Sequence, residues 1–316
     1  MRFLLSLFIK LSQKRYFSLK KETGGTKEMW ILYAIGSSFF AGITAVLAKC
    51  GIQKTNSNVA TAIRTIVVLL FSWLMVFLTG AQTGLTQISS KTLLFLVLSG
   101  LATGASWLCY FHALQHGDIN KVVPIDKSGT ILTILLALIF LKEGVTGQKL
   151  FCVLLIAAGT FLMITRKDTT KEVQKSGSHW MLFAILSAIF ASLTAILGKV
   201  GIEGVDSNLG TAIRTTVVLL MAWLMVFATG QQKGVRTIEK KELLFICLSG
   251  LATGLSWLCY YKALQDGQAS VVVPIDKLSI LITIAFSRIV WKERLTKKAM
   301  LGLLLLTVGT VFMALI

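Results

Sequence analysis

The chain is poor in the residues that build metal centres, disulfides and acid–base catalytic sites. Its 316 residues include three histidines, five cysteines, 14 acidic residues and two prolines. The cysteines lie in or at the ends of apolar stretches without paired close spacing, which indicates small core residues. His112 and His116 are four residues apart, but no Glu follows His112 as a zinc-protease helix requires, and no phosphate-binding glycine loop is present. We therefore predict no metal, no cofactor and no enzyme activity.

Acidic residues are also few relative to basic ones. The 32 Lys and Arg residues against 14 Asp and Glu give a net charge of +18, which in a soluble protein indicates nucleic-acid binding. Here the basic residues lie mainly in short gaps between apolar runs, and 55% of the chain is hydrophobic. This pattern is typical of loops that meet anionic lipid headgroups. It predicts an integral, multi-pass protein of the plasma membrane whose partner is the lipid bilayer, not nucleic acid.

An internal repeat organises the rest of the chain. Trp30 recurs as Trp180 and Arg64 as Arg214, an offset of 150 positions that holds without a gap to residue 166, with roughly half of the aligned residues identical. The predicted domains are a basic N-terminal extension (1–29), a first repeat (30–166), a basic linker (167–179) and a second repeat (180–316). The extension has no counterpart in the second repeat. It is an interface segment, a targeting peptide or, by our hypothesis, a stretch that precedes a working start at Met29.

Each copy divides into five apolar stretches near the length of about 20 residues that crosses a hydrocarbon core. Only helices and closed barrels span lipid, and these stretches lack the strict alternation of barrel strands. The predicted helices lie near 30–50, 58–79, 92–113, 119–141 and 148–165, and near 180–200, 208–229, 242–264, 269–291 and 299–316. An odd number of spans per copy inverts the second copy. The predicted fold is an all-α membrane protein with ten transmembrane helices in two inverted five-helix repeats.

Loop charges bear on the orientation of this bundle. The second and fourth loops of copy two and the linker are basic and share one side, which the positive-inside rule predicts to be cytoplasmic. The basic residues of 1–29 would instead hold the N-terminus inside, so the orientation of the termini stays open.

Charged residues inside the apolar stretches are the main functional clue, because a charge in the hydrocarbon core costs about 2.5–3.5 kcal/mol on insertion scales. Arg64 and Asp126 lie about 10 Å deep from the same face, at 1.5 Å per residue, and could pair. Inversion places the equivalent cluster near the opposite face. Each pair either locks two helices together or belongs to a site for substrate or coupling ion. The charged candidates are Arg64, Asp126, Lys127, Arg214, Asp276 and Lys277.

Prolines and aromatic residues accompany these charges. Pro124 and Pro274 precede them, where a missing backbone donor either disturbs the helix and frees carbonyls or marks a late helix start. Aromatic residues close to helix ends are either interface-belt residues or the lining of a cavity. The aromatic candidates are Trp107, Tyr110, Trp257 and Tyr260.

Glycines spaced four apart recur on the third helix of each half. This spacing permits close approach of membrane helices, so we predict helix packing, with a hinge as the alternative. The residues are Gly100, Gly104, Gly250 and Gly254.

Several of these motifs together resemble the EamA-type unit of the drug/metabolite transporter superfamily, in both copies over residues 30–316. They are Thr61-Ala62-Ile63-Arg64-Thr65, Ser99-Gly100-Leu101-Ala102-Thr103-Gly104, Pro124-Ile125-Asp126-Lys127 and Lys292-Glu293-Arg294-Leu295-Thr296. The resemblance implies a ten-helix bundle with a central cavity that moves small metabolites or drugs without ATP hydrolysis. Copy one departs from the pattern at residues 141–146, where the loop is less basic.

The predicted function is secondary transport of a small molecule by alternating access between the two repeats. The excess of basic groups favours an anionic or zwitterionic substrate, and a homodimer is left open. The alternatives are a non-transporting membrane scaffold or regulator and, ranked lower, a membrane-embedded enzyme.

Overall fold

The structure is a computed structural model that describes residues 29–51, 54–116, 119–163, 179–290 and 296–316. The N-terminal extension and most of the linker lie outside these ranges. The hypothesis of a start at Met29 and the predictions from the charge of these segments therefore also concern residues outside the described ranges. Repeat one contains α2 (Met29–Gly51), α3 (Ser57–Leu78), η1 (Ala81–Gln87), α4 (Ser90–His116), α5 (Ile119–Lys127), α6 (Gly129–Phe140) and α7 (Gly147–Met163). Repeat two contains α8 (His179–Gly201), α9 (Ser207–Ala228), η2 (Gln231–Thr237), α10 (Lys240–Asp266), α11 (Ala269–Lys277), α12 (Ser279–Val290) and α13 (Lys297–Leu315).

These helices confirm the predicted fold class. Eight stretches of the described chain are long and apolar enough to cross a membrane, and Gly147–Met163 is a shorter apolar helix. The fourth span of each repeat is divided, into α5 and α6 in repeat one and into α11 and α12 in repeat two. No strand occurs among the described residues.

Equivalent residues start equivalent helices in the two repeats. The side chains of Asn56 and Asp206 cap α3 and α9 by accepting the backbone N–H of the residue two positions on. Likewise, the Thr146 hydroxyl accepts the N–H of Lys149, and the Thr296 hydroxyl accepts that of Ala299. Such caps satisfy N–H groups that have no partner inside the helix.

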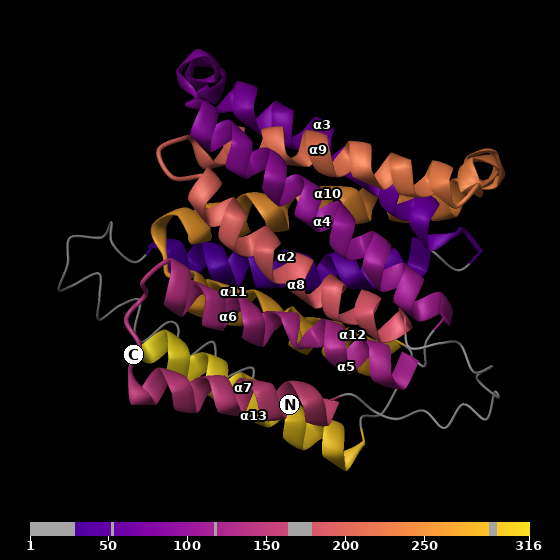
Figure 1. Ribbon diagram of the computed structural model, residues 1–316. Helices are drawn as coiled ribbons and strands as arrows, with labels where there is room; N and C mark the ends of the chain where they lie inside the picture. The colour runs from indigo at the N-terminus through magenta and orange to yellow at the C-terminus, as the bar shows by residue number, and fades with distance from the viewer. Residues whose placement is uncertain (1–28, 52–53, 117–118, 164–178, 291–295) are drawn as a thin grey trace.

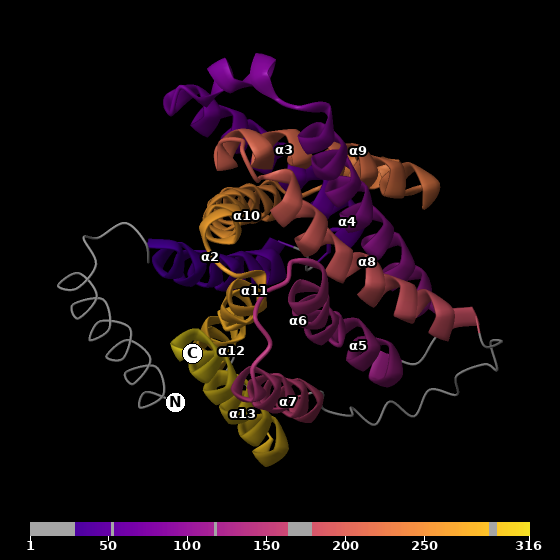
Figure 2. The same cartoon turned by 60° about the vertical axis from the view of Figure 1, so that its left-hand side comes forward.

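Packing between the repeats dominates the bundle. The α3–α9 pair lies at one edge and the α7–α13 pair at the other, with α2 on α10 and α8 on α4 between them (Figures 1 and 2). Every one of these pairs joins one repeat to the other. Each repeat therefore needs the other to bury its helix faces.

The two ends of the bundle are named here by what they carry. The terminal face holds the start of α2 at Met29 and the end of α13 at Leu315, and lies at the left of Figure 1. The linker face holds the end of α7 at Met163 and the start of α8 at His179, at the right. Half-helices α6 and α11 reach the terminal face, and α5 and α12 reach the linker face.

Glycines on α4 and α10 allow close packing across the repeats. A Cβ added to Gly100 would lie 2.7 Å from the Val217 Cβ on α9, and one added to Gly104 would lie 2.4 Å from the Met221 Cβ. On the other side, a Cβ at Gly250 would lie 2.7 Å from the Val67 Cβ of α3. Gly254 is similarly close to Phe71. These short distances show that α4 approaches α9, and α10 approaches α3, at the glycines.

Candidate functional site

The break in the fourth span places two charged pairs deep in the bundle. Half-helix α5 has nine residues and ends at Lys127, and α11 has nine and ends at Lys277. At 1.5 Å per residue each half-helix is about 13 Å long, close to half of a hydrocarbon core of about 30 Å. Asp126-Lys127 enters from the linker face and Asp276-Lys277 from the terminal face. Both pairs therefore reach the middle of the membrane.

The prolines do not start these helices, so the late-start alternative is wrong. The helix containing Pro124 begins at Ile119, and Pro274 lies inside α11, which begins at Ala269. The interruption follows the charged pair. At Ser128 and Leu278 the backbone N–H bonds the carbonyl three residues back, at 3.1 and 3.0 Å, so the turn tightens before the next half-helix begins.

Each aspartate is held by a serine of the opposite repeat. Ser187 on α8 donates to Asp126 Oδ1 at 2.9 Å, and Ser37 on α2 donates to Asp276 Oδ1 at 2.6 Å. Ser187 and Ser37 occupy equivalent positions, so the same contact occurs twice. A hydroxyl that donates to a carboxylate makes a charge-assisted hydrogen bond, which is stronger than one between neutral groups.

The neighbouring lysines are more exposed than the aspartates. The side chains of Lys127 and Lys277 are 59% and 52% exposed, against 21% and 18% for Asp126 and Asp276. The ammonium-to-carboxylate distances within each pair are 3.9 and 3.8 Å, longer than a hydrogen bond. Lys277 also lies within electrostatic range of Lys127. The two lysines are therefore closer together than two clusters near opposite faces would be, whereas Arg214 and Arg64 lie on helices that begin at opposite faces.

The arginines do not pair with these aspartates, which corrects the predicted pairing. Arg214 donates from Nε to Ser99 Oγ at 2.9 Å and from Nη2 to Thr103 Oγ1 at 2.5 Å, both on α4 of the other repeat. Arg64 has one long contact, 3.5 Å from Nη2 to Thr61 Oγ1 on its own helix. Arg214 is 2% exposed, whereas Arg64 is half-buried. Hydroxyls on adjacent cross-repeat helices lie nearer to Arg214 than the carboxylate does.

Aromatic rings surround Arg214. Its guanidinium carbon lies 5.1 Å from the Trp257 ring centroid and 4.8 Å from that of Tyr261, within the range of cation–π attraction. Tyr260 packs edge-on against Tyr261, at 5.3 Å between centroids, and lies within electrostatic range of Asp276 and Arg214. This places Trp257 and Tyr260 in the polar interior.

The equivalent aromatic residues of repeat one lie in different surroundings. Trp107 packs against an apolar cluster that includes Val59 and Ala222, and Tyr110 lies within electrostatic range of Asp126. The arrangement of an arginine between aromatic rings is therefore more complete around Arg214 of repeat two than around the equivalent Arg64 of repeat one.

Small hydroxyl residues are the main feature of the site that sequence reasoning missed. They join α4 to α8 and α10 to α2, for example through Ser99 to the Thr194 carbonyl at 2.7 Å and through Ser249 to the Thr44 carbonyl at 3.2 Å. The feature of the sequence that could have revealed them is that these serines and threonines recur at equivalent positions of the two repeats, inside apolar helices. The missed residues are Ser37, Thr44, Ser99, Thr103, Ser106, Ser187, Thr194, Ser249, Thr253 and Ser256.

At the terminal face, several contacts join the two repeats. Half-helix α11 packs against α6, whereas the equivalent helices α5 and α12 make at most marginal contact near the linker face (Figure 2). Glu143, in the connection from α6 to α7, accepts the backbone N–H groups of Ala269 at 2.6 Å and Ser270 at 2.9 Å. Nearby, the Lys149 ammonium donates to Gln268 Oε1 at 2.9 Å. The first turn of α11 is thus attached to repeat one.

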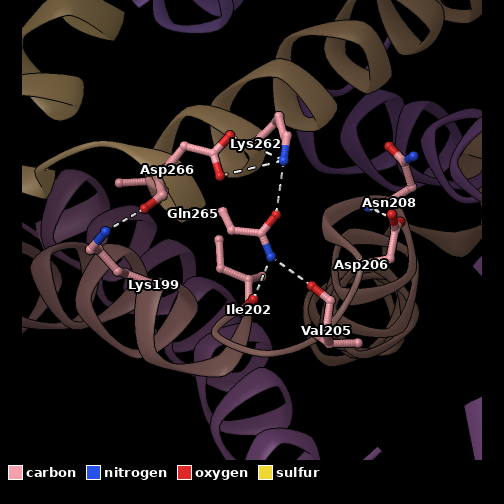
Figure 3. Close-up of polar contacts among 9 residues, drawn as sticks. Lys199, Ile202, Val205, Asp206, Asn208, Lys262, Gln265 and Asp266 are labelled. Atoms are coloured by element: carbon pink, nitrogen blue, oxygen red, sulfur yellow. Dashed lines mark hydrogen bonds and ion pairs between the residues drawn. The ribbon is translucent and has the colours of Figure 1, made fainter. Parts of the chain in front are cut away.

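Repeat two adds further contacts at the same face. Lys199 donates to the carbonyls of Leu264 and Gly267 at 2.5 and 2.6 Å, at the end of α10. The Gln265 amide donates to the carbonyls of Ile202 and Val205 at 2.7 and 2.6 Å, so it joins the end of α10 to the α8–α9 connection (Figure 3).

The described contacts at the linker face include an exposed ion pair. Lys54 Nζ lies 2.6 Å from Glu239 Oε1, with both side chains more than half exposed. This hydrogen bond raises the pKa of the Lys54 ammonium from its ordinary value. Glu242 accepts the N–H groups of Lys54 and Thr55 at 2.9 and 3.0 Å. These contacts attach the α2–α3 connection to α10 but do not join α5 to α12.

Among the described residues, no group of three or more His, Cys, Asp and Glu side chains could hold a metal ion. The polar residues at the breaks are lysines, aspartates, hydroxyls and aromatic rings. These groups can bind a small polar molecule through ion pairs and hydrogen bonds.

Inverted repeats, divided helices and polar residues at mid-depth define the class, which is that of multi-pass membrane transporters. The model of the EamA-like transporter family matches residues 28–165 and 178–315, and the chain belongs to this family. The two matches lie one on each repeat. Family and fold together identify an integral membrane protein that works as a transporter of small molecules.

Relatives carry similar descriptions. A Sinorhizobium sp. protein named as an uncharacterized transporter in the cobO 3' region is 42% identical over 135 residues, which is 43% of this chain and 96% of the relative. An uncharacterized transporter of Helicobacter pylori is 24% identical over 228 residues, 71% of this chain and 74% of the relative. These names indicate a transporter rather than an enzyme.

A solved structure shares the fold. One protein crystal structure superposes with a TM-score of 0.70 at 13% sequence identity, covering 92% of this chain and 98% of the other.

Proposed function

We propose that the protein is a secondary transporter that moves an anionic or zwitterionic small molecule across the plasma membrane by alternating access between its two repeats. The supporting observation is the unequal packing of equivalent half-helices. Half-helix α11 packs on α6 near the terminal face, while α5 and α12 make at most marginal contact near the linker face. In a molecule built from two similar repeats, this asymmetry is what one of two exchangeable states requires.

In the second state the roles of the repeats exchange. Half-helix α5 packs on α12 and closes the linker face, while α11 separates from α6 and opens the terminal face. Opening the terminal face breaks the hydrogen bonds from Ala269 and Ser270 to Glu143. The breaks at Ser128 and Leu278 allow each half-helix to tilt without moving the other half of its span.

The substrate binds at the breaks, between the two charged pairs. Asp126 and Asp276 remain bonded to serines of the opposite repeat, so they link substrate binding to the contact between repeats. A coupling proton on either aspartate would weaken that contact, because a neutral carboxyl group accepts a weaker hydrogen bond than a carboxylate does.

Flux measurements test this proposal. The purified full chain is reconstituted in liposomes, and counterflow of a panel of labelled metabolites is measured without ATP. Uptake of at least one metabolite, stimulated by the same unlabelled metabolite inside, is expected. If a correctly folded protein gives no counterflow with any member of a broad panel, the scaffold alternative replaces transport.

Thiol labelling tests the alternating states separately from the choice of substrate. A Lys277→Cys variant in a background without other cysteines is treated with a membrane-impermeant maleimide from either side of sealed vesicles. Labelling of position 277 is expected to be faster from the linker face and slower, but measurable, from the terminal face as the protein exchanges states, and a Lys91→Cys control on the terminal face should be labelled from the other side. Equal rates of labelling from both sides would contradict a terminal face that is closed in the favoured state.

A further inference from the structure

Lys127 and Lys277 differ from Lys149 and Lys199 in having no short contact. Among the described residues, neither ammonium has a hydrogen-bond acceptor within 3.5 Å, and the nearest carboxylate oxygens lie at 3.9 and 3.8 Å. By contrast, Lys149 bonds Gln268 at 2.9 Å, and Lys199 bonds two backbone carbonyls. An ammonium has three donors. The two lysines at the breaks therefore have donors available to a ligand.

Their depth excludes lipid as the neighbour of these ammonium groups. Each lysine ends a nine-residue half-helix, about 13 Å from the face where that helix begins. Side chains that are 59% and 52% exposed at this depth border space that protein does not fill. A charged group in hydrocarbon is costly, so the space must contain water or an opposite charge.

The two lysines border the same space. They come from opposite repeats, yet Lys277 lies within electrostatic range of Lys127. A helical side chain leans toward the N-terminus of its helix, which for Lys277 is the terminal face. The packing of α11 on α6 covers that side of the break, whereas α5 and α12 make at most marginal contact toward the linker face. The space beside the two ammonium groups is therefore expected on the linker side.

The surrounding charges favour an anion there. The carboxylates of Asp126 and Asp276 already accept hydrogen bonds from Ser187 and Ser37, which leaves them less available to bind a cation. Arg214, held between hydroxyls and aromatic rings, adds a positive charge without a carboxylate partner. The starts of α6 and α12 also lie at the breaks, and helix N-termini carry partial positive charge.

We propose that Lys127 and Lys277 form one anion-binding site at the centre of the membrane, where they bind the carboxylate or phosphate group of the transported molecule. This proposal rests on the proposed transport function and specifies its substrate. The anion bridges the two repeats and relieves the repulsion between the ammonium groups. One shared site, rather than two half-sites, then holds the substrate while the faces open and close around it.

Ligand-dependent thermal unfolding of the purified full chain tests the site without measuring transport. The probes are inorganic phosphate, succinate and tetramethylammonium, each compared with sodium chloride at equal ionic strength. A ligand that binds the folded state alone raises the Tm. Phosphate or succinate is expected to raise the Tm, and tetramethylammonium is not. The phosphate and succinate arms distinguish the two kinds of anionic group.

Matched variants assign the effect to the lysines. Lys127→Gln and Lys277→Gln are each expected to weaken the apparent anion affinity at least about tenfold, which corresponds to about 1.4 kcal/mol. The double variant should abolish the response. Lys127→Arg and Lys277→Arg should retain it, and Lys91→Gln on the surface should not change it.

Four outcomes would overturn the proposal. They are the absence of stabilisation by either anion, an unchanged anion response in the double variant, stabilisation by tetramethylammonium alone, and stabilisation by an anionic lipid in mixed micelles but by neither soluble anion. Loss of counterflow with intact lysine-dependent anion binding would refute the transport proposal and leave the site. Counterflow that persists in the double variant would refute the site and leave transport.

Discussion

Arg214 and Arg64 occupy equivalent positions in the two repeats but have different surroundings. Arg214 bonds Ser99 and Thr103 of the other repeat, and two aromatic rings flank it. The residues equivalent to Ser99 and Thr103 are Ser249 and Thr253, but the hydrogen bond of Arg64 is instead to Thr61 on its own helix, at 3.5 Å. Arg214 lies on α9, which begins at the terminal face, and Arg64 lies on α3, which begins at the linker face. Similar sequences therefore have different contacts, just as α11 packs on α6 while the equivalent helices α5 and α12 make at most marginal contact.

One sequence difference accompanies this asymmetry. Tyr261 of repeat two, which contacts Arg214, corresponds to Phe111 of repeat one. The Tyr261 hydroxyl is also close to Ser99. The side chain of Tyr261 therefore adds a hydroxyl group that the equivalent position of the first repeat lacks.

The largest expected effect comes from replacing the arginines. Arg214→Lys keeps the charge but loses the fork that reaches two hydroxyls and the flat group that stacks on the rings. We expect it to reduce the free energy of unfolding by about 2–3 kcal/mol, since hydrogen bonds to charged groups contribute about 1.5–3 kcal/mol each. Arg64→Lys should cost less than about 1 kcal/mol. Unfolding in mixed micelles with SDS measures both, and equal losses would remove the asymmetry.

The next effect concerns the carboxylate that holds α11. Glu143→Gln retains one acceptor for Ala269 or Ser270 but loses the negative charge at a helix N-terminus, which should cost about 1–2 kcal/mol. It should also increase maleimide labelling of Lys277→Cys from the terminal face. Glu239→Gln is the control at the linker face, where an exposed ion pair contributes about 0–1 kcal/mol. A larger loss in the free energy of unfolding for Glu239→Gln than for Glu143→Gln would show that contacts at the linker face contribute more stability than those at the terminal face.

A smaller effect is expected where the repeats differ by one hydroxyl. Tyr261→Phe makes repeat two resemble repeat one at this position and should cost about 0.5–1.5 kcal/mol. Because Arg214 keeps its two hydroxyl partners in this variant, we expect it still to contribute more to the free energy of unfolding than Arg64 does. An Arg214→Lys loss measured in the Tyr261→Phe background tests this, and a loss no larger than that of Arg64→Lys would assign the whole asymmetry to Tyr261.

The smallest difference is expected where both halves make the same contact. Ser37→Ala and Ser187→Ala each remove one hydroxyl that donates to an aspartate, and each should cost about 1 kcal/mol. The two losses should agree within about 0.5 kcal/mol. A clear inequality in paired unfolding curves would show that the asymmetry of the faces extends to the centre of the bundle.

Much of the fold could be predicted because hydrophobicity and repetition determine it. The predicted span near 58–79 corresponds to Ser57–Leu78, and that near 208–229 to Ser207–Ala228. Apolar length sets such limits, since a span must cover the hydrocarbon core. The break after Lys127 could not be predicted from hydropathy, because residues 119–141 are long enough for one continuous span.

The candidate site could be predicted only in part. The depth of Asp126 and Asp276 follows from their positions in the chain, and an intramembrane charge indicates a polar neighbourhood. The partners of Arg214 and of the aspartates could not be derived in this way. The choice between a carboxylate and a hydroxyl depends on which cross-repeat helices lie adjacent, and Ser37 and Asp276 are 239 positions apart.

The sequence alone determined that this protein spans the membrane as two inverted copies of one unit, because apolar length and an odd number of spans leave no other arrangement. It also determined which charges enter the membrane. Only the tertiary structure decided that Lys127 and Lys277 lie within electrostatic range of each other, that the arginines bond to hydroxyls, and that α11 packs on α6 at the terminal face. The two repeats have similar sequences, so local preferences are similar in both, and the different contacts of equivalent helices depend on how the repeats pack together.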